Sequence, residues 1–209
     1  MGKILFITGI GTDVGKSYAT GWLARRMMDK GMKVATQKFI QTGNVGRSED
    51  IEVHRRLMGI DSLPEDVDLT TSPIIFTYPA SPDLASRIDG RKLDLTLADR
   101  STELLAKKYD RVLVEGAGGI MVPLEGDYLT IDYIRDRKLP VALVTNGKLG
   151  SVSDTLTSLY AIKGYGLKLE TVIYNPWFDQ DARIAADTRD YLRRHVETRF
   201  PDAEFLIMD

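Results

Sequence analysis

The chain has 209 residues, a length that suits one α/β domain, and we expect a single domain over residues 1–209. Hydrophobic residues make up 43% of it and charged residues 28%, an ordinary globular balance that supports a buried core. The net charge of -2 argues against the basic surface that nucleic-acid binding requires, and the absence of cysteine excludes disulfides, thiolate metal sites and cysteine nucleophiles.

No segment of the sequence resembles a secretory signal or a membrane-spanning helix. The first apolar run, Ile4–Thr8, stops at a glycine and is shorter than the roughly seven to fifteen apolar residues of a signal-peptide core. No later stretch approaches the roughly 18 apolar residues that a transmembrane helix needs. We therefore expect a soluble, cytoplasmic protein with neither nucleic acid nor membrane as a partner.

Short apolar runs rich in β-branched residues alternate with longer amphipathic segments. The runs predict buried strands at Ile4–Thr8, Val34–Lys38, Arg111–Glu115, Val141–Thr145 and Thr171–Asn175. The amphipathic segments predict helices at Tyr18–Lys30, Leu95–Lys108, Ser153–Gly164 and Asp181–Phe200. Four prolines in Leu63–Pro82 predict loops there. This alternation predicts an α/β fold with a mostly parallel sheet covered by helices on both faces.

Ligands of such sheets bind at the carboxyl ends of the strands, so the residues that close each predicted strand are candidates for function. These residues are the loop from Gly9 onward, Lys38, Glu115, Thr145-Asn146 and Asn175. They bring a basic loop, two ionisable side chains and two amides to one edge of the predicted sheet.

The first predicted strand leads into a phosphate-binding loop. Its sequence is Gly9-Ile10-Gly11-Thr12-Asp13-Val14-Gly15-Lys16-Ser17, the Walker A pattern with one additional residue. Backbone N–H groups would face the phosphate oxygens, Lys16 would reach the terminal phosphates and Ser17 would ligate magnesium. The glycine spacing does not match the dinucleotide-binding pattern. We therefore predict a single-domain P-loop NTPase that binds ATP through Asp13, Val14, Gly15, Lys16, Ser17 and Tyr18.

A buried strand delivers the carboxylate of Glu115 to its carboxyl end, as a Walker B strand does. Four small residues, Gly116-Ala117-Gly118-Gly119, follow it and would allow a ligand to approach the backbone closely. Carboxylate and hydroxyl oxygens from Glu115 and Ser17 suit octahedral magnesium that is shared with phosphate. The alternative is that Glu115 only caps a turn.

Other ionisable residues leave their roles open. Lys38 is either a solvated strand end or a second cation that neutralises charge on a transferring phosphoryl group. Asp50 begins a predicted helix, where a cap and a functional carboxylate are equally compatible with the local sequence. His54 and His195 lie on charged helical stretches without a partner pattern, which predicts surface positions for both.

Several motifs together resemble the dethiobiotin synthetase family. They are Thr8-Gly9 through Gly15-Lys16-Ser17, Lys38 with Thr42-Gly43, Val114-Glu115-Gly116-Ala117-Gly118-Gly119, Lys148-Leu149-Gly150 and Asn175, in order across almost the whole chain. The resemblance implies an ATP- and Mg2+-dependent cyclo-ligase of biotin biosynthesis. In that reaction 7,8-diaminopelargonate and CO2 form a carbamate, ATP converts it to a carbamic-phosphoric anhydride, and the second amine closes the ureido ring of dethiobiotin, releasing phosphate beside ADP.

The resemblance also implies roles for individual residues. The catalytic group would stabilise the carbamate and the transferring phosphoryl and comprises Lys38, Lys16 and Thr12. The magnesium ligands would be Ser17, Asp50 and Glu115. ATP would be held, beyond the phosphate loop, by Glu115, Gly116, Ala117, Gly118, Asn175 and Pro176, with Asn175 reading the adenine edge. The substrate would contact Thr42, and its carboxylate would bind Gly150 and Ser151 across a homodimer interface.

The sequence departs from the family's pattern at three places. Phe39 stands where proline is common, and Asp187 stands where the family has an aromatic residue. The sequence ends at Asp209, where members of the family continue. Two alternatives remain open. One is a switch-like P-loop ATPase, although such proteins carry an additional lysine early in the loop, where this chain has Ile10 and Gly11. The other is a diverged paralogue acting on another small acid.

Overall fold

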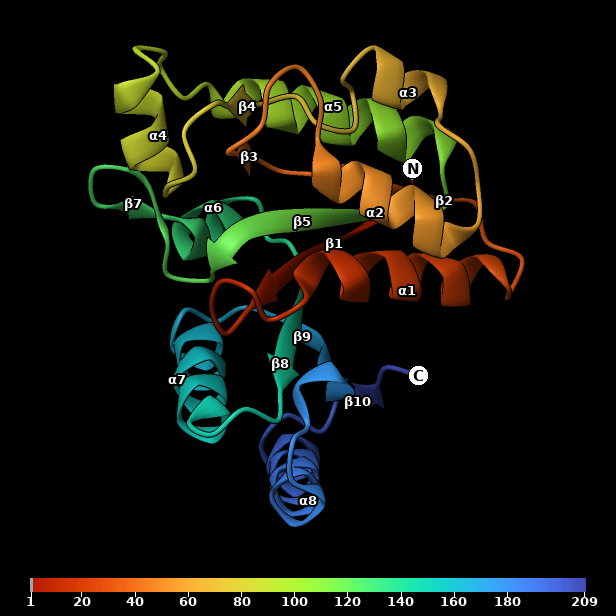
Figure 1. Cartoon of the computed structure of the whole chain (residues 1–209), viewed down its shortest axis with the longest axis vertical. Coiled ribbons are helices and arrows are strands. Elements are labelled where there is room, and N and C mark those ends of the chain that lie inside the picture. The colour runs from red at the N-terminus through yellow and green to blue at the C-terminus, as the bar shows by residue number, and fades with distance from the viewer. Residues whose placement is uncertain (1) are drawn as a thin grey trace.

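A six-stranded parallel sheet organises the chain in the computed structural model, which describes residues 2–209 (Figure 1). Met1, the first residue of the expected domain, lies outside the described residues. In spatial order the strands are β10 (Glu204–Ile207), β9 (Leu169–Asn175), β8 (Val141–Asn146), β1 (Lys3–Gly9), β5 (Arg111–Gly119) and β2 (Val34–Lys38). The parallel α/β prediction is therefore confirmed.

Helices cover both faces of this sheet. The long ones are α1 (Lys16–Met28), α2 (Glu49–Met58), α5 (Leu95–Lys108), α7 (Ser151–Gly164) and α8 (Ala182–Arg199). Successive strand residues serve opposite faces: Leu5 and Ile7 pack in one buried cluster with Leu23 of α1, whereas Phe6 packs in the other with Leu105 of α5. The inner strands β1 and β8 are largely apolar on both sides because they are covered on both sides.

Three short helices and two small sheets complete the described chain. The helices are α3 (Pro64–Val67), α4 (Pro82–Ile88) and α6 (Thr130–Asp136), and a 3-10 turn, η1 (Pro176–Phe178), follows β9. A parallel pair joins β3 (Gln41–Thr42) to β4 (Ile75–Phe76), and an antiparallel pair joins β6 (Pro123–Glu125) to β7 (Tyr128–Leu129). The predicted loop Leu63–Pro82 is mostly irregular; its regular parts are α3, β4 and Pro82, the first residue of α4.

Four of the five predicted strands are longer than predicted: β1, β8 and β9 by one or two residues and β5 by four. β5 continues past Glu115 to Gly119, because Gly9 pairs with Gly119 after a shift in register between β1 and β5. β10 was not predicted as a strand, since it is a four-residue edge strand whose side chains are half-buried or exposed. The extension of β5 brings its small residues beside the phosphate loop.

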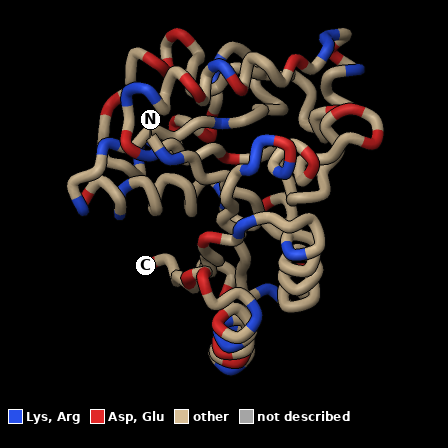
Figure 2. Tube along the Cα trace, turned by 180° about the vertical axis from the view of Figure 1, so that it is seen from behind, with Lys and Arg blue, Asp and Glu red and all other residues tan. Residues whose placement is uncertain are grey.

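Surface charge is mixed. Figure 2 shows lysine and arginine interspersed with aspartate and glutamate along the chain, without one face reserved for either sign. Among residues 2–209, no helix has the length and apolar character needed to cross a membrane.

Candidate active site

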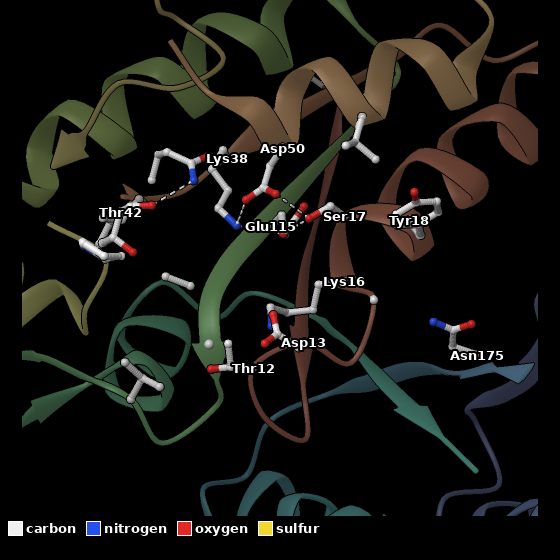
Figure 3. Close-up of a pocket in the computed structure, with 18 of the residues that line it drawn as sticks. Thr12, Asp13, Lys16, Ser17, Tyr18, Lys38, Thr42, Asp50, Glu115 and Asn175 are labelled. Carbon is white, nitrogen blue, oxygen red and sulfur yellow. Dashed lines mark hydrogen bonds and ion pairs between the residues drawn. The ribbon is translucent and has the colours of Figure 1, made fainter. Parts of the chain in front are cut away.

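A cavity of about 1160 Å3 lies at the carboxyl ends of β1, β2, β5 and β9, where the sequence placed the candidate residues (Figure 3). The predicted residues that line it are Thr12, Asp13, Gly15, Lys16, Ser17, Tyr18, Lys38, Thr42, Asp50, Glu115, Ala117, Gly118, Asn175 and Pro176. Val14 and Gly116 are buried behind this wall. Gly150 and Ser151 begin α7 and do not line the cavity. Most of the predicted site is thus assembled within one chain.

The phosphate loop is shaped by Gly15, which precedes α1 with a φ of 89° in the left-handed region. A Cβ at this position would lie 2.2 Å from Nδ2 of Asn175, so the space also requires glycine. That Nδ2 donates to the carbonyl oxygen of Val14, which ties β9 to the loop. The start of α1 has no side-chain cap, which leaves its N–H groups available to an anion.

Lys16 folds back over the loop, where its Nζ donates to the carbonyl oxygen of Gly11 at 2.9 Å. Burial disfavours its charge and lowers its pKa to about 8, although the Glu115 carboxylate opposes this shift. The positive charge of Lys38 adds to the lowering. A polyphosphate in the cavity would supply the anionic partner that this ammonium lacks.

Ser17, Asp50 and Glu115 converge from α1, α2 and β5 (Figure 3). The Ser17 Oγ lies 2.8 Å from Oδ1 of Asp50 and 2.9 Å from Oε1 of Glu115. Asp50 is not the cap of its helix, because Ser48 holds that position and accepts from the N–H of Ile51. The carboxylate of Asp50 is therefore available to the site. Three hard oxygen donors at one point fit a magnesium ion that also binds phosphate.

The ammonium group of Lys38 pairs with the same two carboxylates, those of Asp50 and Glu115. Its Nζ lies 2.8 Å from Oε1 of Glu115 and 2.5 Å from Oδ2 of Asp50. Burial disfavours the charge of Lys38, but these two carboxylates outweigh it and raise its pKa. Burial likewise opposes the charge of Glu115, yet Lys38 and His54 hold the pKa of that carboxyl well below its usual range. The solvated-lysine alternative is wrong, since the Lys38 side chain is buried in an ion-pair network.

His54 contradicts its predicted surface position. Its side chain is 0% exposed, and its Nε2 lies 2.6 Å from Oε2 of Glu115. It follows Asp50 by one helical turn on α2, so both residues share the face that packs toward β5. The charged residues beside His54 in the sequence led to the prediction of a surface position. One of them, Arg55, is itself buried and paired with Asp66. His195, by contrast, is half-buried between Tyr160 and Tyr191, outside the cavity lining.

Asn175 lines the cavity but is also engaged with the chain. Its Nδ2 donates to Val14, and its Oδ1 accepts from the backbone N–H of Trp177. Trp177 is 85% exposed and lines the cavity beside Pro176. One amide hydrogen and one lone pair of Asn175 stay available to a ligand.

A profile of the family described as "AAA domain" matches residues 3–200. Solved structures of FlhF complexed with GMPPNP/Mg(2+) and of the signal recognition particle receptor FtsY from Elizabethkingia anophelis in complex with GDP share the fold. Their TM-scores are 0.50 and 0.53, at 16% and 12% identity over 90% and 98% of this chain. The chain covers 61% and 56% of those proteins. This likeness concerns the fold alone.

Much closer relatives carry the name ATP-dependent dethiobiotin synthetase. The protein from Haemophilus ducreyi is 46% identical and that from Pasteurella multocida 44%, each matched over all of this chain and over 99% and 98% of its own length. The protein from Chlorobaculum tepidum is 47% identical, over 91% of this chain and 80% of its own. The chain therefore belongs to the family of ATP-dependent dethiobiotin synthetases.

Proposed function

We propose that this chain is a cytoplasmic enzyme, one domain over residues 1–209, that closes the ureido ring of dethiobiotin from 7,8-diaminopelargonate, CO2 and ATP. The observation that carries the proposal is one cavity that unites a phosphate loop, two lysines and an oxygen cluster from Ser17, Asp50 and Glu115. The names of the full-length relatives support the same reaction.

The reaction needs charge stabilisation at each step. One amine attacks CO2, loses a proton and becomes a carbamate, whose oxygen then attacks the γ-phosphorus while ADP leaves. The second amine attacks the carbamate carbon, loses a proton and expels phosphate as the ring closes. Lys16 and Lys38 would stabilise the anionic carbamate and the transferring phosphoryl group, and Thr12 would help to position them.

Magnesium would be held by Ser17, Asp50 and Glu115. The fit rests on their hard oxygen donors, which meet within hydrogen-bonding distance of one another. When bound, the ion would neutralise phosphate charge and orient the terminal phosphates. Lys38 would then exchange its present carboxylate partners for the substrate anions.

The remaining residues would hold the two substrates. ATP would lie along the phosphate loop and α1 start, against Asp13, Val14, Gly15, Lys16, Ser17, Tyr18, Glu115, Gly116, Ala117, Gly118, Asn175 and Pro176. Thr42, on the opposite side of the cavity from Asn175, would contact the diamine. Gly150 and Ser151 of a second subunit would bind the substrate carboxylate at the amino end of α7. The neighbouring Leu149, 93% exposed, supports a homodimer contact there.

Phosphate release by the purified protein tests this proposal. With ATP and magnesium, we expect release only when both 7,8-diaminopelargonate and bicarbonate are present, because the γ-phosphoryl acceptor is the carbamate. The matched control omits the diamine alone. Equal release without the diamine would indicate a switch-like ATPase, and release with another amino acid but not with this diamine would indicate a diverged paralogue.

A further inference from the structure

His54 is a buried imidazole beside the proposed active site that the reaction described above does not use. It lies on α2 with its side chain fully enclosed, and Glu115, its partner, is 1% exposed at the side chain. We propose that His54 is a positioning residue that fixes the Glu115 carboxylate so that one of its oxygens is presented to the divalent cation. This inference rests on the proposed function, since it assigns a task within the same cation site.

The two oxygens of Glu115 have separate partners. Among residues 2–209, the one hydrogen-bond partner of Oε2 is the Nε2 of His54, at 2.6 Å on the buried side. Oε1 faces the cavity side, where Ser17 and Lys38 lie within 2.9 Å. The last torsion of a glutamate is broad and has no strong preference of its own. A hydrogen bond to Oε2 therefore fixes the rotation of the carboxylate group and keeps its other oxygen turned toward the cation.

The imidazole has no other polar task among the residues that the structure describes. Its Nδ1 is buried without a hydrogen-bond partner. Burial of a polar ring is unfavourable unless it is bonded, so an imidazole with a single bond is a poor choice for stability alone. A buried Nδ1 without a partner is tolerated better as a lone pair than as an N–H group. The ring hydrogen therefore lies on Nε2, which donates it to Glu115. All of the polar capacity that this ring uses is thus directed at one carboxylate.

The packing of α2 on α1 holds the ring in place. Gly21 of α1 is the point of close approach: a Cβ there would lie 3.2 Å from the Cα of His54 and 2.8 Å from the Cβ of Leu57. The amino end of α2 is fixed by the Ser48 cap. His54 therefore reaches Glu115 from a helix that is anchored at its start and packed closely on its neighbour, which is the rigidity that a residue orienting a metal ligand needs.

Binding of Mn2+ in the presence of ADP, followed by electron paramagnetic resonance, tests the proposal without turnover. We expect His54→Ala to weaken Mn2+ binding by about 10- to 100-fold, the usual effect of losing a residue that holds a metal ligand by a hydrogen bond. His54→Gln should recover most of this loss, because its amide Nε2 can donate to Oε2. Met58→Ala is the matched control: Met58 is fully buried one turn further along α2 and has no hydrogen bond to Glu115. It should lower stability and leave Mn2+ affinity unchanged.

The proposal is overturned if His54→Ala binds Mn2+ as the wild type does, if Met58→Ala weakens binding equally, or if His54→Gln gives no recovery. If the wild type makes no dethiobiotin but His54→Ala still weakens Mn2+ binding, the proposed function is wrong and the positioning role of His54 is retained. Should His54→Ala fail to fold, the glutamine variant and the wild-type spectrum below still decide the matter.

Nitrogen NMR of the wild-type imidazoles gives an independent readout, because the chain has only two histidines. We expect His54 to show the tautomer with hydrogen on Nε2 and to shift when magnesium and ADP are added. His195, held between Tyr160 and Tyr191, serves as the internal reference and should not shift. The assignment is contradicted if His54 carries its hydrogen on Nδ1, or if its signal does not shift when magnesium and ADP are added.

Discussion

Replacing Lys38 by methionine should tighten the binding of a divalent cation, although the same change removes activity. In the ligand-free protein the Lys38 ammonium already occupies the proposed cation ligands, at 2.8 Å from Glu115 and 2.5 Å from Asp50. A cation that binds these carboxylates must displace that internal charge. Methionine is an unbranched side chain only one atom shorter than lysine, and it removes the competing charge.

The size of the effect follows from the charges. Two unit charges about 4 Å apart interact by about 1 kcal/mol in water and about 4 kcal/mol at the effective dielectric of about 20 found in partly buried sites. Each 1.4 kcal/mol or so is a factor of ten, so the affinity for Mn2+ should rise by about fivefold to several hundredfold. Loss of the buried pair should also lower the melting temperature of the ligand-free variant, and magnesium should restore part of it.

Titration calorimetry with Mn2+ at pH 7, below the pKa of about 8 of Lys16, and without nucleotide measures this directly. Lys16→Met is the matched control, because it also removes a nearby positive charge, but the Lys16 Nζ donates to Gly11 rather than to a carboxylate. We expect a clearly smaller gain for it. Equal affinities in the wild type and the Lys38 variant, or equal gains in the two variants, would refute the competition between Lys38 and the cation.

Three further predictions concern the loop and the stability of the fold. The kcat/KM for ATP should fall above about pH 8, because the pKa of about 8 means that free Lys16 loses its charge there, and Lys16→Arg should abolish this fall in a pH-rate profile. Gly15→Ala should abolish nucleotide binding in calorimetry, because its φ of 89° disfavours alanine and the Cβ would meet Asn175 at 2.2 Å; binding at wild-type affinity would contradict the loop geometry. Arg55→Met should cost about 3–5 kcal/mol in urea unfolding, since it leaves the Asp66 carboxylate, 2.7 Å away, buried and unpaired, and a loss below about 1 kcal/mol would argue against that pair.

Exposed ion pairs give the control for the last of these. Arg87 and Asp83 lie 3.0 Å apart on α4, with the arginine side chain 66% exposed. Water and salt screen such a pair, so Arg87→Met should change the unfolding free energy by less than about 1 kcal/mol.

The sequence predicted the central sheet well because its signal is local. The run Arg111–Glu115 is short, bounded and apolar between its two ends, as a strand buried on both faces must be, and the structure places it between β1 and β2 as part of β5. The edge strand Glu204–Ile207 was missed because its side chains are only half-buried. The extension of β5 to Gly119 depends on a shift in pairing with Gly9, which no local pattern encodes.

The candidate site was predicted as a set of residues but not as a network. Glu115 and Lys38 close neighbouring strands, so their proximity follows from the parallel topology. Their direct pairing with Asp50 depends on how α2 packs, and so does the burial of His54. His54 and Asp50 are one turn apart, and that spacing was the one signal in the sequence that placed the two side chains on one face. Charged neighbours on the same helix led instead to the prediction that His54 lies at the surface.

The proposed reaction is tested most directly by supplying the purified protein with 7,8-diaminopelargonate, ATP, magnesium and carbon-13-labelled bicarbonate, and analysing the product by mass spectrometry and carbon NMR. We expect dethiobiotin that carries the label at the ureido carbonyl, with one phosphate released for each labelled ring. Phosphate without labelled product, or no consumption of ATP at all, would contradict the assignment of this cavity to ureido-ring closure.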